Sequence, residues 1–126
     1  MTLKELIEKT KENLQDFSFN MSDFLDAFYN SKSTSKYRKN AIKEEPVHYE
    51  EIPQYLYAFV AATAHKLAED YNLEIPNWTL KDIYCLKYPY FAMNAKGNLR
   101  LYLLVESPPA FKFRNLYVPE NCLSRV

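Results

Sequence analysis

The sequence predicts a mostly α-helical protein, a single compact domain built around a central helix at about 50–72. Three observations support this prediction. The chain has 126 residues, which is the size of one domain. Apolar residues recur at helical spacing in several windows, and helix-capping residues precede some of them. The single glycine, Gly97, excludes Rossmann and P-loop folds, because their phosphate-binding loops need several glycines.

The first helix is predicted at about 3–15. Thr2 and Glu5 have the spacing of a capping box, which satisfies two free backbone amides at a helix start. One face of this helix then carries Leu3, Leu6, Ile7, Thr10 and Leu14 at helical spacing. A second helix is expected to begin at Ser22 as its cap and to end near Asn30, with Phe24, Leu25 and Phe28 on its apolar face.

The segment 31–40 lacks strong apolar periodicity and begins a basic run. From 32 to 43 there are five cations and no acid: Lys32, Lys36, Arg38, Lys39 and Lys43. Such a run is usually a solvated linker or a short polar helix. The alternative is a basic arm that contacts nucleic acid or an acidic partner. Five cations neutralise few phosphates, so we expect that binding to be weak and sensitive to salt.

The central helix is the strongest predicted element. Glu50 and Glu51 place negative charge at its positive end, and Pro53 suits its first turn. Asn72 is expected to end the helix in a left-handed conformation, with Leu73 as the hydrophobic contact behind it. One face is apolar and the opposite face is small, which predicts packing on two sides; the small face carries Ala58, Ala61, Ala62 and His65.

His65 is interpreted as a structural histidine. A metal site needs several ligands at suitable spacing. The residues four positions before and after His65 are Ala61 and Glu69, so no such group is present in the local sequence. The alternatives are a metal ligand or a general base.

The C-terminal half is predicted to be irregular and rich in aromatic residues. Trp78 is expected to fill the core, and Thr79 to Asp82 resembles a capping box that starts a short helix ending near 84 or 86. The aromatic side chains that follow form either an exposed contact patch or a buried loop, of which burial is the commoner outcome; they are Tyr88, Tyr90 and Phe91.

Residues 99–105 are ambiguous between helix and strand. Apolar residues alternate there as in a strand, but leucine favours a helix. We favour the helix. The alternative is a short β-hairpin of 99–105 with 114–118.

The composition argues against several functional classes. Lys and Arg number 16, as do Asp and Glu, so no net charge attracts nucleic acid or an anionic membrane. No apolar run approaches 18 residues, and the N-terminus lacks a signal-peptide core, so we expect a cytoplasmic protein without membrane contact. Cys85 and Cys122 are then expected to be reduced. Histidines and cysteines have no zinc spacing, and no nucleophile motif is present, so we expect no enzyme activity, cofactor or metal.

The C-terminal tail combines prolines, aromatics and cations. Ser107-Pro108-Pro109 should end the preceding element. If the next residues are extended, Phe111 and Phe113 face one way and Lys112 and Arg114 face the other. Glu106 is a candidate ion-pair partner of Arg114 or Arg100. The tail is therefore either a structural strap or a recognition patch for a partner protein, formed by Lys112, Arg114 and Arg125.

The tail resembles the C-terminal signature of an uncharacterised bacterial family. The pattern is Glu106-Ser-Pro-x-Ala-Phe-x-x-Arg-Asn-x-Tyr-Val, followed by Asn121-x-Leu-Ser-Arg125. Segments 57–64 and 75–78 are also similar, so the family-like core spans 50–126, behind an N-terminal helical part at 1–45. The signature residues that the resemblance marks for contact or structure are Glu106, Phe111, Lys112, Arg114, Asn115 and Arg125.

The resemblance implies a role through partners. The family has no catalytic assignment. Its longer relatives are fused to a DNA-binding helix-turn-helix and often lie beside a nucleotidyltransferase-like toxin gene, which implies an antitoxin or accessory role. This chain lacks a recognisable helix-turn-helix and has Lys112-Phe113-Arg114 where the family often has a run of arginines. We therefore expect a protein partner, such as a neighbouring-gene toxin. The alternatives are self-association, a nucleic-acid-binding accessory, and an enzyme with an unrecognised site.

Overall fold

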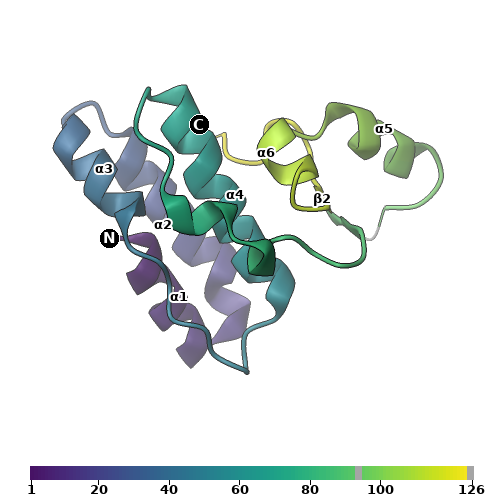
Figure 1. The fold of residues 1–126 in the computed structure, drawn as a ribbon, viewed down its shortest axis with the longest axis horizontal. Coiled ribbons are helices and arrows are strands. Elements are labelled where there is room, and N and C mark those ends of the chain that lie inside the picture. Colours follow the sequence, from purple (N-terminus) through teal and green to yellow (C-terminus); the bar gives the residue numbers. More distant parts are fainter. Residues whose placement is uncertain (93–94, 125–126) are drawn as a thin grey trace.

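The computed structural model describes residues 1–92 and 95–124, and its centre is the helix α4 (Gln54–Asp70). The helices α1 (Leu3–Glu12), α2 (Phe17–Tyr29) and α3 (Ser35–Lys43) lie at one end of the molecule. The C-terminal elements lie at the other end (Figure 1). One hydrophobic core, which runs in sequence from Leu3 to Leu123, joins the two ends. The predicted mostly helical domain around a central helix is confirmed.

The central helix is shorter than predicted at both ends. Residues 49–52 form a turn, closed by a hydrogen bond from the Ile52 N–H to the Tyr49 carbonyl at 3.2 Å, so Pro53 precedes the first helical turn. At the other end Asn72 has a φ of 54°, as expected for a left-handed cap. The Leu73 N–H donates to the Ala68 carbonyl at 2.7 Å, which is the bond of a Schellman motif.

The N-terminal helices differ from prediction in where α2 begins. The Thr2 side chain caps α1 as predicted, by accepting the Glu5 N–H at 3.1 Å. The short 3₁₀ turn η1 (Leu14–Asp16) then leads directly into α2, because the Asn13 side chain caps it. The second helix therefore starts at Phe17 and not at the predicted cap Ser22. The short polar helix expected within the basic run is α3, capped by Thr34.

Two short 3₁₀ turns replace the helix predicted after Trp78. They are η2 (Asn77–Leu80) and η3 (Asp82–Tyr84), and the extended residue Lys81 separates them. Trp78 fills the core as expected: it is 7 % exposed, and its indole N–H donates to the Ile42 carbonyl at 3.2 Å.

The alternative of a β-hairpin is wrong, and the favoured helix is confirmed. Residues Asn98–Glu106 form the helix α5 after Gly97, whose φ of 58° reverses the chain. The strand β2 (Leu116–Tyr117) pairs instead with β1 (Tyr90–Phe91), in parallel. Between α5 and β2 lies the short helix α6 (Pro109–Lys112). Among the described residues, no helix is both long and apolar enough to span a bilayer.

Candidate protein-interaction surface

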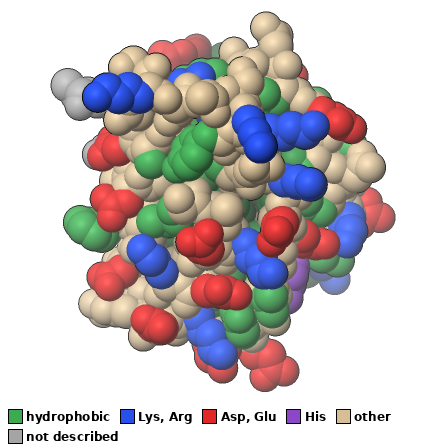
Figure 2. Space-filling view, turned by 90° about the vertical axis from the view of Figure 1, so that its left-hand side faces the viewer, with side chains coloured by type: hydrophobic (Ala, Val, Ile, Leu, Met, Phe, Trp, Pro, Cys, Tyr) green, Lys and Arg blue, Asp and Glu red, His purple; other side chains and the backbone are tan. Residues whose placement is uncertain are grey.

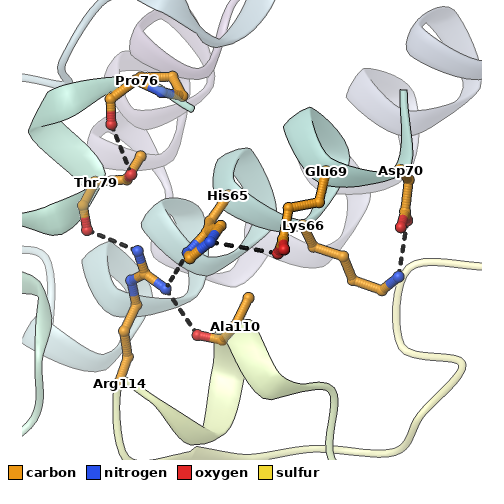
Figure 3. A network of polar contacts seen from close by, with 8 residues as sticks. All are labelled: His65, Lys66, Glu69, Asp70, Pro76, Thr79, Ala110 and Arg114. Carbon is orange, nitrogen blue, oxygen red and sulfur yellow. Dashed lines mark hydrogen bonds and ion pairs between the residues drawn. The ribbon is translucent and has the colours of Figure 1, made fainter. Parts of the chain in front are cut away.

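Arg114 lies at the centre of a buried polar network and not in an exposed patch. Its side chain is 0 % exposed. Its guanidinium donates to the Thr79 carbonyl at 2.7 Å and to the Ala110 carbonyl at 2.8 Å. A third contact joins Nη1 to Nδ1 of His65 at 3.1 Å (Figure 3). Arg114 therefore ties α6 and η2 to the central helix.

The contact with Arg114 determines which ring nitrogen of His65 carries the proton. A guanidinium is always a donor, so Nδ1 of His65 accepts, and its proton is on Nε2, 3.3 Å from a Glu69 carboxylate oxygen. Burial, and then the charge of Arg114, lower the pKa of His65, and Glu69 raises it less. Burial also lowers the pKa of Arg114. His65 is thus a neutral bridge between a buried cation and an exposed carboxylate.

The other signature residues of the tail have mostly structural contacts. Phe111 is buried against the Phe59 ring, with centroids 5.1 Å apart. The Lys112 ammonium donates to the Val105 carbonyl at 2.8 Å. Asn115 has a φ of 65°, and its amide donates to the Leu86 carbonyl at 3.2 Å. Arg125 lies outside the described residues.

Two predictions about the tail are wrong. Glu106 does not pair with Arg114, because that guanidinium points inward to backbone carbonyls; Arg100, the other predicted partner, lies over the Phe91 ring at 4.3 Å. Phe111 and Phe113 do not alternate with the cations along an extended run, since α6 is helical. As a result Phe113 is 61 % exposed and Arg114 is buried. A recognition patch that includes Arg114 is not formed.

The basic run is only partly free to bind an anion. The Arg38 guanidinium donates to the carbonyls of Phe28 and Asn30 at 2.9 and 3.2 Å, and it lies 4.6 Å from the Tyr71 ring centroid. It holds the end of α2 and is not directed to a phosphate. The four lysines are exposed, but Figure 2 shows acidic side chains interspersed with basic ones on the face that carries α3. No basic stripe results.

The most unusual surface of the molecule belongs to α5, which lies at the far end from α1–α3 (Figure 1). Within this helix, whose residues are all described, Leu103 is the buried side chain. Val105 is 68 % exposed and Leu101 is 61 % exposed. At 100° per residue, these two lie about 40° apart and each about 160° from Leu103. Leu99 is 41 % exposed but lies about 40° from Leu103, on the side of the helix that faces the fold. We call the outward-facing apolar side chains of this helix the α5 surface: Leu101, Tyr102, Leu104 and Val105.

Aromatic residues before α5 are more exposed than expected. Tyr88 is 73 % exposed, because a bend at 87–88 turns it outward, so the expectation of a buried loop is wrong for this residue. Tyr90 is 38 % exposed and stacks on Tyr55 with centroids 4.4 Å apart. Phe91 stacks on Tyr117 at 4.9 Å. The first stack joins the sheet to α4, and the second lies between the two strands of the sheet.

A second apolar feature is a groove between α2, α4 and β2. Its cavity has a volume of about 330 Å³, and Phe17, Met21, Phe59 and Leu116 are among the side chains that line it. Cys122 also lines it, and burial raises the pKa of this thiol to about 11. The thiol is therefore protonated at neutral pH and is a poor nucleophile.

One further polar cluster bears on the question of catalysis. The Tyr84 hydroxyl donates to a Glu45 carboxylate oxygen at 2.5 Å and lies 2.8 Å from Nε2 of His48. Burial, and then Glu45, raise the pKa of Tyr84, so the phenol stays protonated. This cluster does not line the groove. In the described part of the chain, no group of three or more His, Cys, Asp or Glu residues is placed to hold a metal ion.

Comparison with protein-family models, curated proteins and solved structures finds no match for this chain. The geometry of the chain is therefore the main basis for a functional proposal.

The residues that sequence reasoning missed are those of the α5 surface, although a signal was present. Seven of the nine residues of α5 carry no charge, and five of these are Leu or Val. A helix of that composition has too many apolar residues for one buried stripe.

Proposed function

We propose that this protein is a non-enzymatic interaction module that binds a partner protein through the α5 surface. The observation that carries the proposal is the exposure of Leu101 and Val105 on the side of α5 opposite its buried anchor Leu103. Soluble proteins rarely expose contiguous apolar patches larger than a few hundred Å², and patches near or above that size often mark interaction sites. The surface carries no charged residue, as the centres of protein interfaces do not.

The rest of the C-terminal half supports this surface. The Ser107 hydroxyl accepts the Val118 N–H at 2.8 Å and lies 2.5 Å from the Leu103 carbonyl, so it joins the end of α5 to the chain after β2. Arg114 fixes α6, which follows α5 directly. The signature residues of the tail thus act as a frame, and the apolar helix that they hold makes the contact.

The partner that we propose is the product of a neighbouring gene, which this chain restrains as an antitoxin-like or accessory subunit in the cytoplasm. This part of the proposal rests on the resemblance of the tail. Mixed charges around α3 and the engagement of Arg38 give less support to the nucleic-acid alternative.

Co-expression with the neighbouring gene product tests the proposal. Leu101→Glu places a charge at the centre of the α5 surface. It removes a contact worth roughly 1–2 kcal/mol and buries a carboxylate, so we expect affinity to fall by more than about tenfold. Phe19→Glu is the matched control, because Phe19 is a helical residue that is 68 % exposed on α2. Loss of the complex in the first variant and retention in the second supports the proposal; no complex with the parent chain contradicts it.

A further inference from the structure

We infer that the α5 surface also fits a second copy of this chain, with the two α5 helices antiparallel about a two-fold axis between Leu101 and Val105. The inference rests on the proposed function, since it names a partner for the same surface. In this arrangement Leu101 of one copy contacts Val105 of the other, and the contact occurs twice. Tyr102 and Leu104 lie on either side of this contact.

The absence of charge on the α5 surface makes it complementary to itself. A two-fold interface places one surface patch against the same patch of the other copy. A patch of one charge would therefore repel its copy, whereas the α5 surface meets only apolar groups. Arg100 does not interfere, because its guanidinium lies over the Phe91 ring at 4.3 Å. The chain has equal numbers of basic and acidic residues, so two copies are not driven apart by net charge.

Glu106 favours the antiparallel direction. It is exposed at the end of α5. In a parallel pair the two Glu106 carboxylates would lie level with each other. In an antiparallel pair centred at residue 103 they are displaced by six residues, or about 9 Å along the helix axis. Like charges at that separation are largely screened at physiological salt.

The area of the α5 surface predicts a weak dimer. With exposed fractions from 39 to 68 %, its four side chains present about 400 Å² per copy. Two copies therefore bury about 800 Å², which is the size of a weak, transient interface. We therefore expect weak association, detectable only over a wide concentration series.

Sedimentation velocity of the purified chain between about 1 and about 300 µM tests the inference. The expected result is a rise in mass from 14.9 kDa towards twice that value. Leu101→Glu should abolish the rise, and Phe19→Glu should leave it unchanged. Circular dichroism of both variants should match that of the parent chain. A chain that is monomeric throughout, or a dimer that Leu101→Glu leaves intact, overturns the inference.

Disulfide cross-linking tests whether the two α5 helices run antiparallel. In a chain with Cys85→Ser and Cys122→Ser, the substitutions Leu101→Cys and Val105→Cys are made separately, oxidised alone and then oxidised as a mixture. The antiparallel pair predicts that the mixed product of the two variants predominates. Predominant cross-linking of the Leu101→Cys variant to itself would instead establish a parallel pair.

The two proposals fail differently. Sedimentation of the pure chain tests the dimer, and co-purification tests binding to the neighbouring gene product. A monomer whose complex with that product depends on Leu101 overturns the dimer and leaves the proposed function intact.

Discussion

Replacement of Arg114 by Met should cost about 3–5 kcal/mol of unfolding free energy. The guanidinium is fully buried and donates to the carbonyls of Thr79 and Ala110 and to His65. Met fills a similar volume but leaves these three acceptors without a donor, at about 1–3 kcal/mol for each one that stays buried. Loss of the buried charge offsets part of this penalty, because a guanidinium is costly to desolvate.

Urea unfolding followed by circular dichroism measures this cost. Arg114→Lys should lose roughly 2–3 kcal/mol, because a single ammonium cannot reproduce the fork that reaches two carbonyls. Arg100→Met is the control, since Arg100 is exposed, and it should change stability by less than about 1 kcal/mol.

A second readout distinguishes the network from packing alone. Burial, and then the charge of Arg114, lower the pKa of His65. Loss of that charge in Arg114→Met should raise the pKa of His65 measured by NMR, and Arg114→Lys, which keeps a charge, should raise it less. An Arg114→Met variant that is as stable as the parent chain, with an unchanged His65 pKa, would refute the reasoning.

Three further predictions concern pH, a turn and a buried hydroxyl. The folded-state pKa of His65 is lowered, so its stability contribution is complete above the unfolded value of 6.5 and is lost as pH falls through the folded pKa. Urea unfolding at a series of pH values below 6.5 should show falling stability, and His65→Gln should reduce that fall. Gly97→Ala should cost about 1–3 kcal/mol, because Gly97 has φ of 58° and ψ of −128°, a conformation that strains any residue with a Cβ. An added Cβ would meet no atom within 4 Å, so the cost comes from the backbone alone. Faster hydrogen exchange in α5 is the expected result, and unchanged exchange would contradict it. Ser107→Ala should lower the unfolding free energy by roughly 1–3 kcal/mol, because the buried Val118 N–H loses its acceptor; thermal denaturation measures this, and a variant as stable as the parent chain would mean that the N–H finds another acceptor.

The sequence predicted best those features that local chemistry determines. The central helix ends where Asn72 and Leu73 provide a left-handed cap and its hydrophobic contact. Both residues can be recognised from the sequence without tertiary information. The start of α2 was missed because its signal lies earlier, in the Asn13 cap of a 3₁₀ turn that continues into the helix. Leucine-rich composition correctly favoured a helix over a strand in α5.

Features that depend on distant contacts were not predictable. Arg114 binds Thr79 and His65, which lie 35 and 49 positions away in the sequence. Arginine is rarely buried without such partners. The sequence therefore left Arg114 open between a structural strap and a recognition patch, because its partners could not be identified from sequence. The α5 surface was missed for a related reason: apolar residues surround the helix, and only the fold shows that Leu103 faces inward while Leu101 and Val105 face outward.

The most direct test of the proposed function is the amount of neighbouring gene product that co-purifies with Leu101→Glu relative to Phe19→Glu. Both substitutions introduce one carboxylate at an exposed apolar helical position. The α5 surface predicts that the first variant retains less than about a tenth of the partner held by the second, as a loss of more than about 1.4 kcal/mol requires. Equal retention by the two variants would contradict the central claim, because the partner would then bind elsewhere on the molecule.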